Sequence, residues 1–135
     1  RPLQYAEMAD FIKQHSSPDF PFLLLGDLNT KGMESFRKDE TSPYTALTTT
    51  LSNAVPKRTL QDTWPLLHPE ALGGTTHQES ADIGKRIDYI LLANPSEPAL
   101  QLTPKTISVD LYQDKRVVAL SDHNAVTAQF IWSKK

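Results

Sequence analysis

The 135-residue sequence contains no cysteine. This absence excludes disulfide bonds and thiolate zinc sites, two common ways of stabilising a small domain. No apolar run comes near the roughly 20 residues that are needed to cross a bilayer. With 39% hydrophobic and 22% charged residues, the composition is that of a globular domain rather than of a disordered chain. The length therefore allows one domain with its own hydrophobic core.

The sequence also lacks an excess of positive charge, because its formal net charge is −2. Proteins that bind duplex DNA usually carry a strongly basic face. Here lysine and arginine are scattered, with small pairs at 57–58, 85–86 and 115–116. The phosphate-binding Walker loop, the dinucleotide-binding glycine pattern and the HExxH and GxSxG motifs are absent as well. These absences argue weakly against tight nucleic-acid binding and remove several enzyme classes.

The hydrophobic pattern predicts an α+β chain built in layers. Residues 2–15 read as an amphipathic helix. The apolar side chains expected on or beside its inner face are Leu3, Tyr5, Met8, Phe11 and Ile12. Residues 22–25 are continuously apolar, which predicts a strand buried on both faces.

Later segments continue the mixed pattern. Residues 43–51 predict a short helix capped by Thr41 or Ser42. Residues 65–74 read as a loop, and residues 75–77 as a short strand. Three further strands are expected at 86–92, 106–111 and 125–132. Both tryptophans, Trp64 and Trp132, are expected in the core because no basic cluster surrounds either of them.

The first motif with chemical potential is PFLLLGDLN at residues 21–29, where Asp27 and Asn29 follow an apolar strand. Strand alternation would point both side chains toward one face. A carboxylate and an amide on that face can hold a water nucleophile and a phosphate oxygen together. The alternative is a Gly-Asp turn that the asparagine closes.

The second motif is RIDYILL at residues 86–92, in which Asp88 lies inside an apolar strand. A buried carboxylate is costly unless it is paired or hydrogen-bonded. Asp88 is therefore expected either to form a salt bridge with Arg86 or to accept a hydrogen bond from a histidine ring. The second arrangement would fix the tautomer of the histidine and stabilise its protonated form.

The third motif is LSDHNAV at residues 120–126, where Asp122 and His123 are neighbours at the start of a strand. Their side chains point in different directions, so one can serve a metal ion and the other a phosphate. The alternative is a surface turn. Upstream, Thr75 and His77 are weaker candidates for contacts with a phosphate oxygen, and the alternative for them is a polar loop.

The three motifs, in this order, resemble those of the endonuclease/exonuclease/phosphatase superfamily, the DNase I-like phosphohydrolases. This resemblance implies a four-layer α/β sandwich of two similar halves, of which residues 1–135 would be the C-terminal half. The N-terminal half of the family carries an asparagine and a glutamate that holds the metal. Because no segment before Asp27 is expected to supply both, the N-terminal half of the same domain, or self-association, is expected to complete the fold.

The resemblance also implies roles for the motif residues in hydrolysis of a phosphate ester by in-line attack of water. Asp27 would orient or deprotonate the water, and Asn29 would bind the substrate. Asp88 would orient His123, which would protonate or stabilise the scissile phosphate.

A metal ion is implied too, with Asp122 as its ligand in this chain. Mg²⁺ is the expected ion and Mn²⁺ a plausible substitute. Thr75 and His77 would line the phosphate pocket, although Thr76 replaces an aromatic residue that some family members have there.

The family implies several substrate classes, because it includes DNases, abasic-site nucleases, deadenylases, sphingomyelinases and inositol polyphosphate phosphatases. The loops of this chain match none of these subfamilies, so nucleic acid, a sphingomyelin-type phospholipid and an inositol phosphate all remain open. The charge balance slightly favours a substrate other than duplex DNA. The alternative to an enzyme is a non-catalytic module of the same fold that serves binding or assembly.

Overall fold

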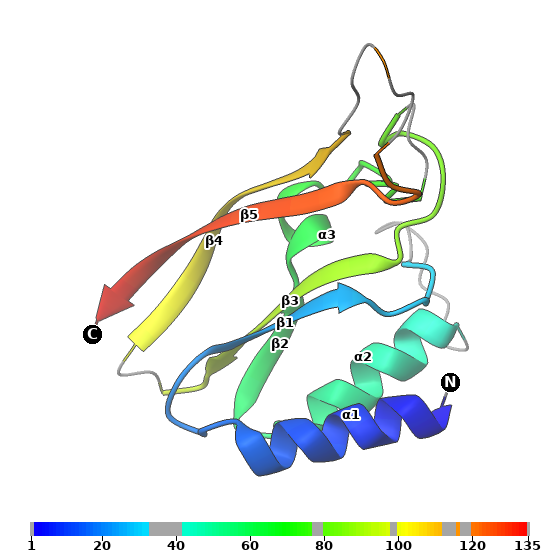
Figure 1. Ribbon diagram of the computed structural model, residues 1–135. Helices are drawn as coiled ribbons and strands as arrows, with labels where there is room; N and C mark the ends of the chain where they lie inside the picture. Colours follow the sequence, from blue (N-terminus) through cyan, green and yellow to red (C-terminus); the bar gives the residue numbers. More distant parts are fainter. Residues whose placement is uncertain are drawn as a thin grey trace.

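The computed structural model describes residues 2–32, 42–76, 80–97, 100–111, 116 and 120–134. Within these residues the chain forms helices and strands in a mixed order (Figure 1). The elements are α1 (Pro2–His15), β1 (Phe22–Asp27), α2 (Pro43–Ala54), β2 (Arg58–Asp62), α3 (Thr63–Leu67), β3 (Asp88–Pro95), β4 (Leu100–Asp110) and β5 (Ala125–Lys134).

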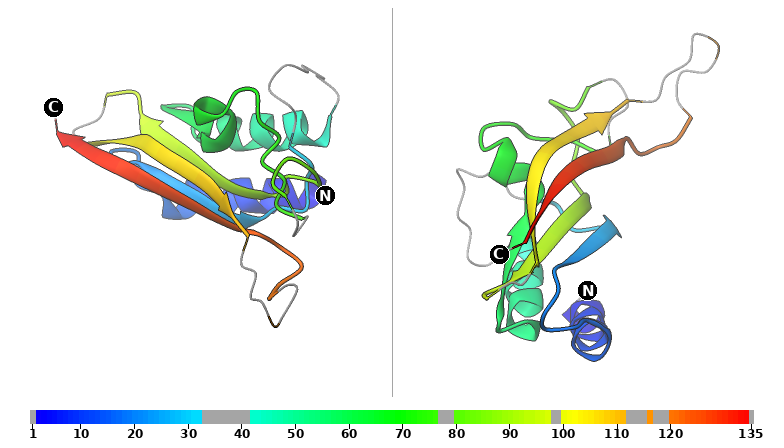
Figure 2. Two further views of the ribbon diagram at one scale, coloured as in Figure 1. Left: turned by 90° about the horizontal axis from the view of Figure 1, so that it is seen from above. Right: turned by 90° about the vertical axis from the view of Figure 1, so that its left-hand side faces the viewer.

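The elements form layers around a three-stranded antiparallel sheet with the order β1-β3-β2. Helices α1 and α2 pack side by side against one face of this sheet, as Figures 1 and 2 show. Strands β4 and β5 form a separate antiparallel ribbon that covers the other face. The chain thus has the mixed α/β architecture that its sequence predicts.

The core beneath the helices is built from the inner faces of α1 and α2 and from alternate residues of β3. Its α1 members are Tyr5, Ala9 and Ile12, which recur at helical spacing. The prediction for two other α1 residues is wrong, because 81% of Leu3 and 62% of Phe11 are exposed. Leu3 and Phe11 lie off the helix face that Tyr5, Ala9 and Ile12 form, so their side chains point away from the sheet.

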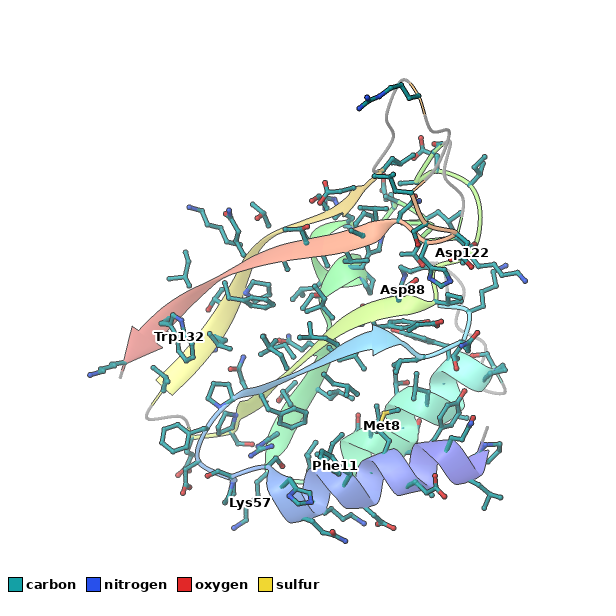
Figure 3. All side chains as sticks on the ribbon, in the orientation of Figure 1. Met8, Phe11, Lys57, Asp88, Asp122 and Trp132 are labelled. Carbon is teal, nitrogen blue, oxygen red and sulfur yellow. The ribbon has the colours of Figure 1, made fainter. Side chains whose placement is uncertain are left out.

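The second core lies between the sheet and the β4-β5 ribbon, around Trp64, Ile90 and Ile107. Alternate residues of β5, Val126, Ala128 and Phe130, close it from outside. Trp132 continues this alternation, but it lies near the far end of β5 and is 63% exposed, so its predicted core position is wrong (Figure 3).

Several local predictions need correction. Strand β1 lies at an edge of the described sheet, and Leu25 near its end is 59% exposed, so β1 is not buried on both faces. The expected loop at 65–74 begins as helix α3, because the Asp62 side chain accepts a hydrogen bond from the Trp64 backbone and caps the helix. Thr75 and Thr76 form a bend rather than a strand.

Other local predictions are confirmed. Helix α1 has the predicted bounds, and Ser42 is the N-cap of α2, with its side chain accepting a hydrogen bond from the Thr45 backbone. None of the helices in the described part of the chain has the length and apolar character needed to span a bilayer.

Candidate functional site

The site begins where β1 ends and β3 starts. These strands run antiparallel, and their register places Asp27 directly opposite Asp88. Two carboxylates opposite each other on neighbouring strands repel, which destabilises the pair unless positive charge compensates. The acidic residues of two separate motifs therefore meet at one end of the sheet, where a cation would stabilise them.

His123 supplies part of this compensation. Its Nδ1 lies 2.8 Å from Oδ2 of Asp88, and the two side chains are 28% and 19% exposed. Because an ionised carboxylate only accepts hydrogen bonds, Nδ1 carries the proton and donates it. This hydrogen bond is the largest effect on the pKa of His123 and raises it. Desolvation opposes the rise, while the negative charges of nearby aspartates reinforce it.

The hydrogen bond between a histidine ring and Asp88, one of the two arrangements that the second motif allows, is thus present. Arg86, the other candidate partner of Asp88, instead pairs with Asp62.

Asp27, Asp88 and His123 could together hold a metal ion. One ligand atom from each lies within 4.8 Å of those of the other two. Asp122, the ligand implied by the family resemblance, is exposed and lies outside this group of three, although its charge acts on His123. Figure 3 shows Asp88 and Asp122 at the same end of the structure. A role of Asp122 in metal binding stays a prediction.

Asp27 and Asn29 are joined by a tight turn. The backbone N–H of Asn29 donates to Oδ1 of Asp27 at 2.7 Å, and its side-chain Nδ2 donates to Oδ2 at 3.1 Å. Asn29 has a φ of 50°, a left-handed conformation that asparagine tolerates well. The two side chains do lie together, but they meet through this turn and not through strand alternation, because β1 ends at Asp27.

Thr75 is fully buried beneath the start of β3. Its Oγ1 accepts hydrogen bonds from the backbone N–H groups of Ile87 (3.1 Å) and Asp88 (3.3 Å) and donates to the carbonyl of Lys85 (3.3 Å). These contacts make Thr75 a support for the Asp88 backbone, while its predicted contact with substrate stays a prediction. His77, the other predicted substrate contact, lies outside the described residues.

The segment around Thr75 also holds the chain that carries His123. The backbone N–H of Asn124 donates to the carbonyl of Thr75 at 2.8 Å, and its side-chain Nδ2 donates to the carbonyl of Gly74 at 3.3 Å. Asn124 is buried and directly follows His123 in the third motif. This bridge explains how two motifs far apart in the sequence place His123 against Asp88.

The sequence profile described as Endonuclease/Exonuclease/phosphatase family matches residues 1–123. The chain belongs to this family. The family prediction from the three motifs is therefore confirmed.

Among solved structures, the chain is similar to the crystal structure of endonuclease/exonuclease/phosphatase from Beutenbergia cavernae DSM 12333. The two share 25% sequence identity, with a TM-score of 0.52. The similarity covers 95% of this chain and 31% of that chain, so this family member spans about a third of the length of the protein it resembles. A comparison with curated proteins gives no match.

Arg86 and Asp62 form a buried ion pair next to the site. The sequence motifs do not predict this pair. Nη1 of Arg86 lies 2.7 Å from Oδ2 of Asp62, and the two side chains are 3% and 5% exposed. The Tyr44 hydroxyl donates to the same carboxylate oxygen at 2.8 Å. Burial alone would lower the pKa of Arg86, but the opposite charge of Asp62 helps to outweigh burial, and the pKa is raised.

The backbone of Arg86 links this pair to the loop that follows β1. Its carbonyl accepts a hydrogen bond from the backbone N–H of Gly32 at 2.8 Å. The hydroxyl of Tyr89 donates to the Thr30 carbonyl and contacts the Arg86 carbonyl at 3.3 Å. The loop carrying Asn29 is thereby fastened to the start of β3.

Proposed function

We propose that this chain supplies part of the active site of a divalent-metal-dependent phosphoesterase, as the C-terminal half of an endonuclease/exonuclease/phosphatase domain. The observation that carries the proposal is the meeting of Asp27, Asp88 and His123 within 4.8 Å in a member of that family. The proposed reaction is hydrolysis of a phosphate ester by in-line attack of water.

The donor set of the site fits a divalent cation. Two opposed carboxylates offer hard oxygen ligands, which suit Mg²⁺ and also Mn²⁺. The exposed carboxylate of Asp122 lies at the same end of the fold and is a further candidate ligand. When bound, the ion would stabilise negative charge that develops on the phosphoryl oxygens.

The side chains of the site can divide the remaining chemistry among them. Asp88 holds Nδ1 of His123, which leaves Nε2 as the ring atom that can reach a phosphate oxygen. The raised pKa of His123 favours the protonated ring, which can donate a proton to the phosphate or stabilise its charge. Asp27 is proposed to orient the attacking water or to accept its proton, and Asn29 to hold the phosphate by its amide.

The experiment that tests this proposal measures Mg²⁺-dependent hydrolysis of bis(p-nitrophenyl) phosphate by a protein that carries the complete domain. His123→Ala should lower turnover by at least about 10²-fold, the usual loss for an acid or electrostatic group. Asp88→Asn should cost nearly as much, because it removes the acceptor that orients the ring. Asp10→Asn, on the exposed surface of α1, is the control and should leave turnover unchanged. Normal turnover in His123→Ala would remove the proposed role of His123.

The substrate class is the finer part of the proposal. The net charge of −2 favours a phosphodiester or small phosphate ester over duplex DNA. Single-stranded nucleic acid, a sphingomyelin-type lipid and an inositol phosphate are the classes to compare in the same assay. A rate for duplex DNA above all three would contradict the preference drawn from charge.

A second candidate function, a binding or assembly module, has support from exposed apolar side chains. Leu25, Ile131 and Trp132 are 59%, 51% and 63% exposed. Such surface is typical of contacts with another chain or another part of the same domain. This candidate predicts self-association of the isolated chain in analytical ultracentrifugation and no Mg²⁺-dependent hydrolysis in the complete domain. Hydrolysis that depends on His123 would exclude a purely non-catalytic role.

A further inference from the structure

A cavity lies at the other end of the sheet from the candidate active site, between the ends of α1 and α2 and the start of β2. Its volume is about 330 Å³, within the range of about 300–1,000 Å³ that is usual for small-molecule sites. Figure 3 shows Lys57, which lines this cavity, far from Asp88 and Asp122. Pro18, Val55 and Pro56 give it apolar walls.

The charged side chains that line this cavity are all basic, although Lys13 also pairs with the exposed Asp10 at 3.8 Å. Lys13, Lys57 and Arg58 line it, and none of the described residues that line it is acidic. Asp19 and Glu97 line a neighbouring hollow that shares Lys57 with this cavity. Because the charged residues that line the cavity are basic, an anion in the cavity would be stabilised.

Arg58 is the unusual member of the set, because it is only 9% exposed. Its Nη1 and Nη2 are both enclosed, and neither has a hydrogen-bond partner among the described residues. The guanidinium carbon lies 4.8 Å from the centre of the Phe22 ring, a contact that stabilises the charge but leaves the N–H groups without an acceptor. Burial lowers the pKa of Arg58, and the negative charge of Asp19 only partly opposes this effect. A buried donor without an acceptor is costly; Arg86, the other buried arginine, lacks a partner only at Nη2 and directs its Nη1 to a carboxylate.

The helix ends explain only part of this arrangement. Both α1 and α2 end beside the cavity, and the carbonyl groups of a final helical turn attract cations. That attraction explains why Lys13 and Arg58 gather there. It does not give Nη1 and Nη2 of Arg58 an acceptor, because no carbonyl of the described residues is hydrogen-bonded to either atom.

The walls of the cavity are held in place by hydrogen bonds. Ser16 donates from its hydroxyl to the Ile12 carbonyl at 2.6 Å, which closes the end of α1. The backbone N–H of Arg58 donates to the Val55 carbonyl at 2.9 Å. The backbone N–H and hydroxyl of Ser96 both donate to the Lys57 carbonyl at 2.9 Å. The backbone that presents the cations is therefore fixed before any ligand arrives.

We propose that this cavity is a second, distal binding site for a phosphate group, carried by a small molecule whose apolar part packs against Pro18, Val55 and Pro56. The three cations match a phosphate dianion, and arginine suits its oxygens because its fork of N–H donors can bind two of them at once. Binding requires a small shift of the Arg58 side chain, which would bring its enclosed nitrogens to the ligand.

The test is an NMR titration of ¹⁵N-labelled protein with phenylphosphonate, whose carbon–phosphorus bond resists hydrolysis. Excess EDTA keeps metal ions away from the carboxylates at the other end of the sheet. The amide signals of Val55, Lys57 and Arg58 should shift and saturate. Methylphosphonate should bind more weakly, because it lacks the ring that the apolar walls would cover.

Substitutions identify the groups that bind. Lys13→Ala and Lys57→Ala, both at exposed positions, should each weaken binding about two- to fivefold, as expected for partly screened charges. Arg58→Met should weaken it at least about tenfold, as expected for hydrogen bonds to a charged group. Lys105→Ala, on the exposed surface of β4, is the matched control and should leave the affinity unchanged. If Arg58→Met does not fold, the affinity of the double variant Lys13→Ala with Lys57→Ala is measured in its place and should be lower than that of either single variant.

Two results would overturn the proposal. One is the absence of saturable shifts around Arg58. If shifts occur only at Asp27, Asp88 and His123, the cavity proposal is overturned but the proposed active site is not. The other is an equal loss of affinity in the Lys105 control and in the cavity variants, which would indicate diffuse attraction to the surface.

The source of the phosphate is decided by a second measurement. Cosedimentation with phosphatidate vesicles, lost in the Lys13 and Lys57 double variant, would identify a lipid headgroup as the source. Phenylphosphonate binding without cosedimentation would identify a soluble phosphate ester. Either result supports a phosphate site in this cavity.

Discussion

The buried pair of Arg86 and Asp62 yields a quantitative prediction for stability. Arg86→Met would leave the carboxylate of Asp62 enclosed without its cation, since the Asp62 side chain is 5% exposed. The Tyr44 hydroxyl and the Trp64 backbone N–H would still donate to it, but both are neutral. Breaking a buried pair from one side typically costs about 3–5 kcal/mol. Asp62→Ala should cost about 1 kcal/mol more, because Asp62 also caps α3.

Replacing both partners gives the decisive comparison. Asp62→Leu combined with Arg86→Met removes both charges and leaves neither partner of the pair buried without the other. This double variant should therefore lie within about 2 kcal/mol of the wild-type free energy of unfolding, far less than the sum of the single losses. Asp10→Ala breaks the exposed pair with Lys13 (3.8 Å) and serves as the control, with an expected change of less than about 0.5 kcal/mol.

The assay is urea unfolding followed by tryptophan fluorescence, because Trp64 lies in the core beside this pair. Each single loss would be large against a total stability of about 5–15 kcal/mol. A loss below about 1 kcal/mol in Arg86→Met would show that water reaches Asp62 and would refute the reasoning. Single losses that simply add up in the double variant would refute the coupling between the two side chains.

Two further predictions concern the carboxylates and the histidine. The pKa of His123, followed by NMR in metal-free buffer, should lie above its ordinary value of 6.5, and Asp88→Asn should lower it. Because the folded-state pKa of His123 is raised, its pair with Asp88 stabilises the fold fully below about pH 6.5. This contribution is lost as the pH rises through the folded-state pKa. A free energy of unfolding that rises with pH across this window would contradict the pairing. Asp27→Asn should stabilise the metal-free protein by a few tenths to about 1 kcal/mol, by removing the repulsion across from Asp88, and should abolish stabilisation by added Mg²⁺. A thermal shift with Mg²⁺ that survives in this variant would contradict the proposed ligand set.

Local features of the fold could be predicted from sequence. The bounds of α1 follow from its periodicity and from the turn residues after it, and the cap of α2 follows from a serine that precedes a proline. The hydrogen bond between Asp88 and His123 is one of two arrangements that the motif allows, and the family resemblance favours it. The helix bounds and the cap depend on short segments whose chemistry is visible in the residues themselves, whereas the hydrogen bond joins two separate motifs and rests on the resemblance.

Features that depend on neighbours in space could not be predicted in the same way. Leu25 belongs to a continuous apolar run and Trp132 to an alternating one, but their burial depends on what covers the sheet at their end of each strand. Arg86 has an acidic neighbour two residues away, yet it pairs with Asp62, at the end of β2. The opposition of Asp27 and Asp88 depends on the register of β1 against β3, which neither motif contains.

The measurement that tests the central claim most directly is a titration of the ¹⁵N-labelled chain with Mn²⁺, followed by paramagnetic broadening of its amide signals. If Asp27 and Asp88 hold a metal ion beside His123, the signals of these three residues and of their neighbours should broaden first, and excess Mg²⁺ should restore them. Broadening that spreads over the exposed acidic residues of the whole surface, or that spares these three positions, would contradict the claim.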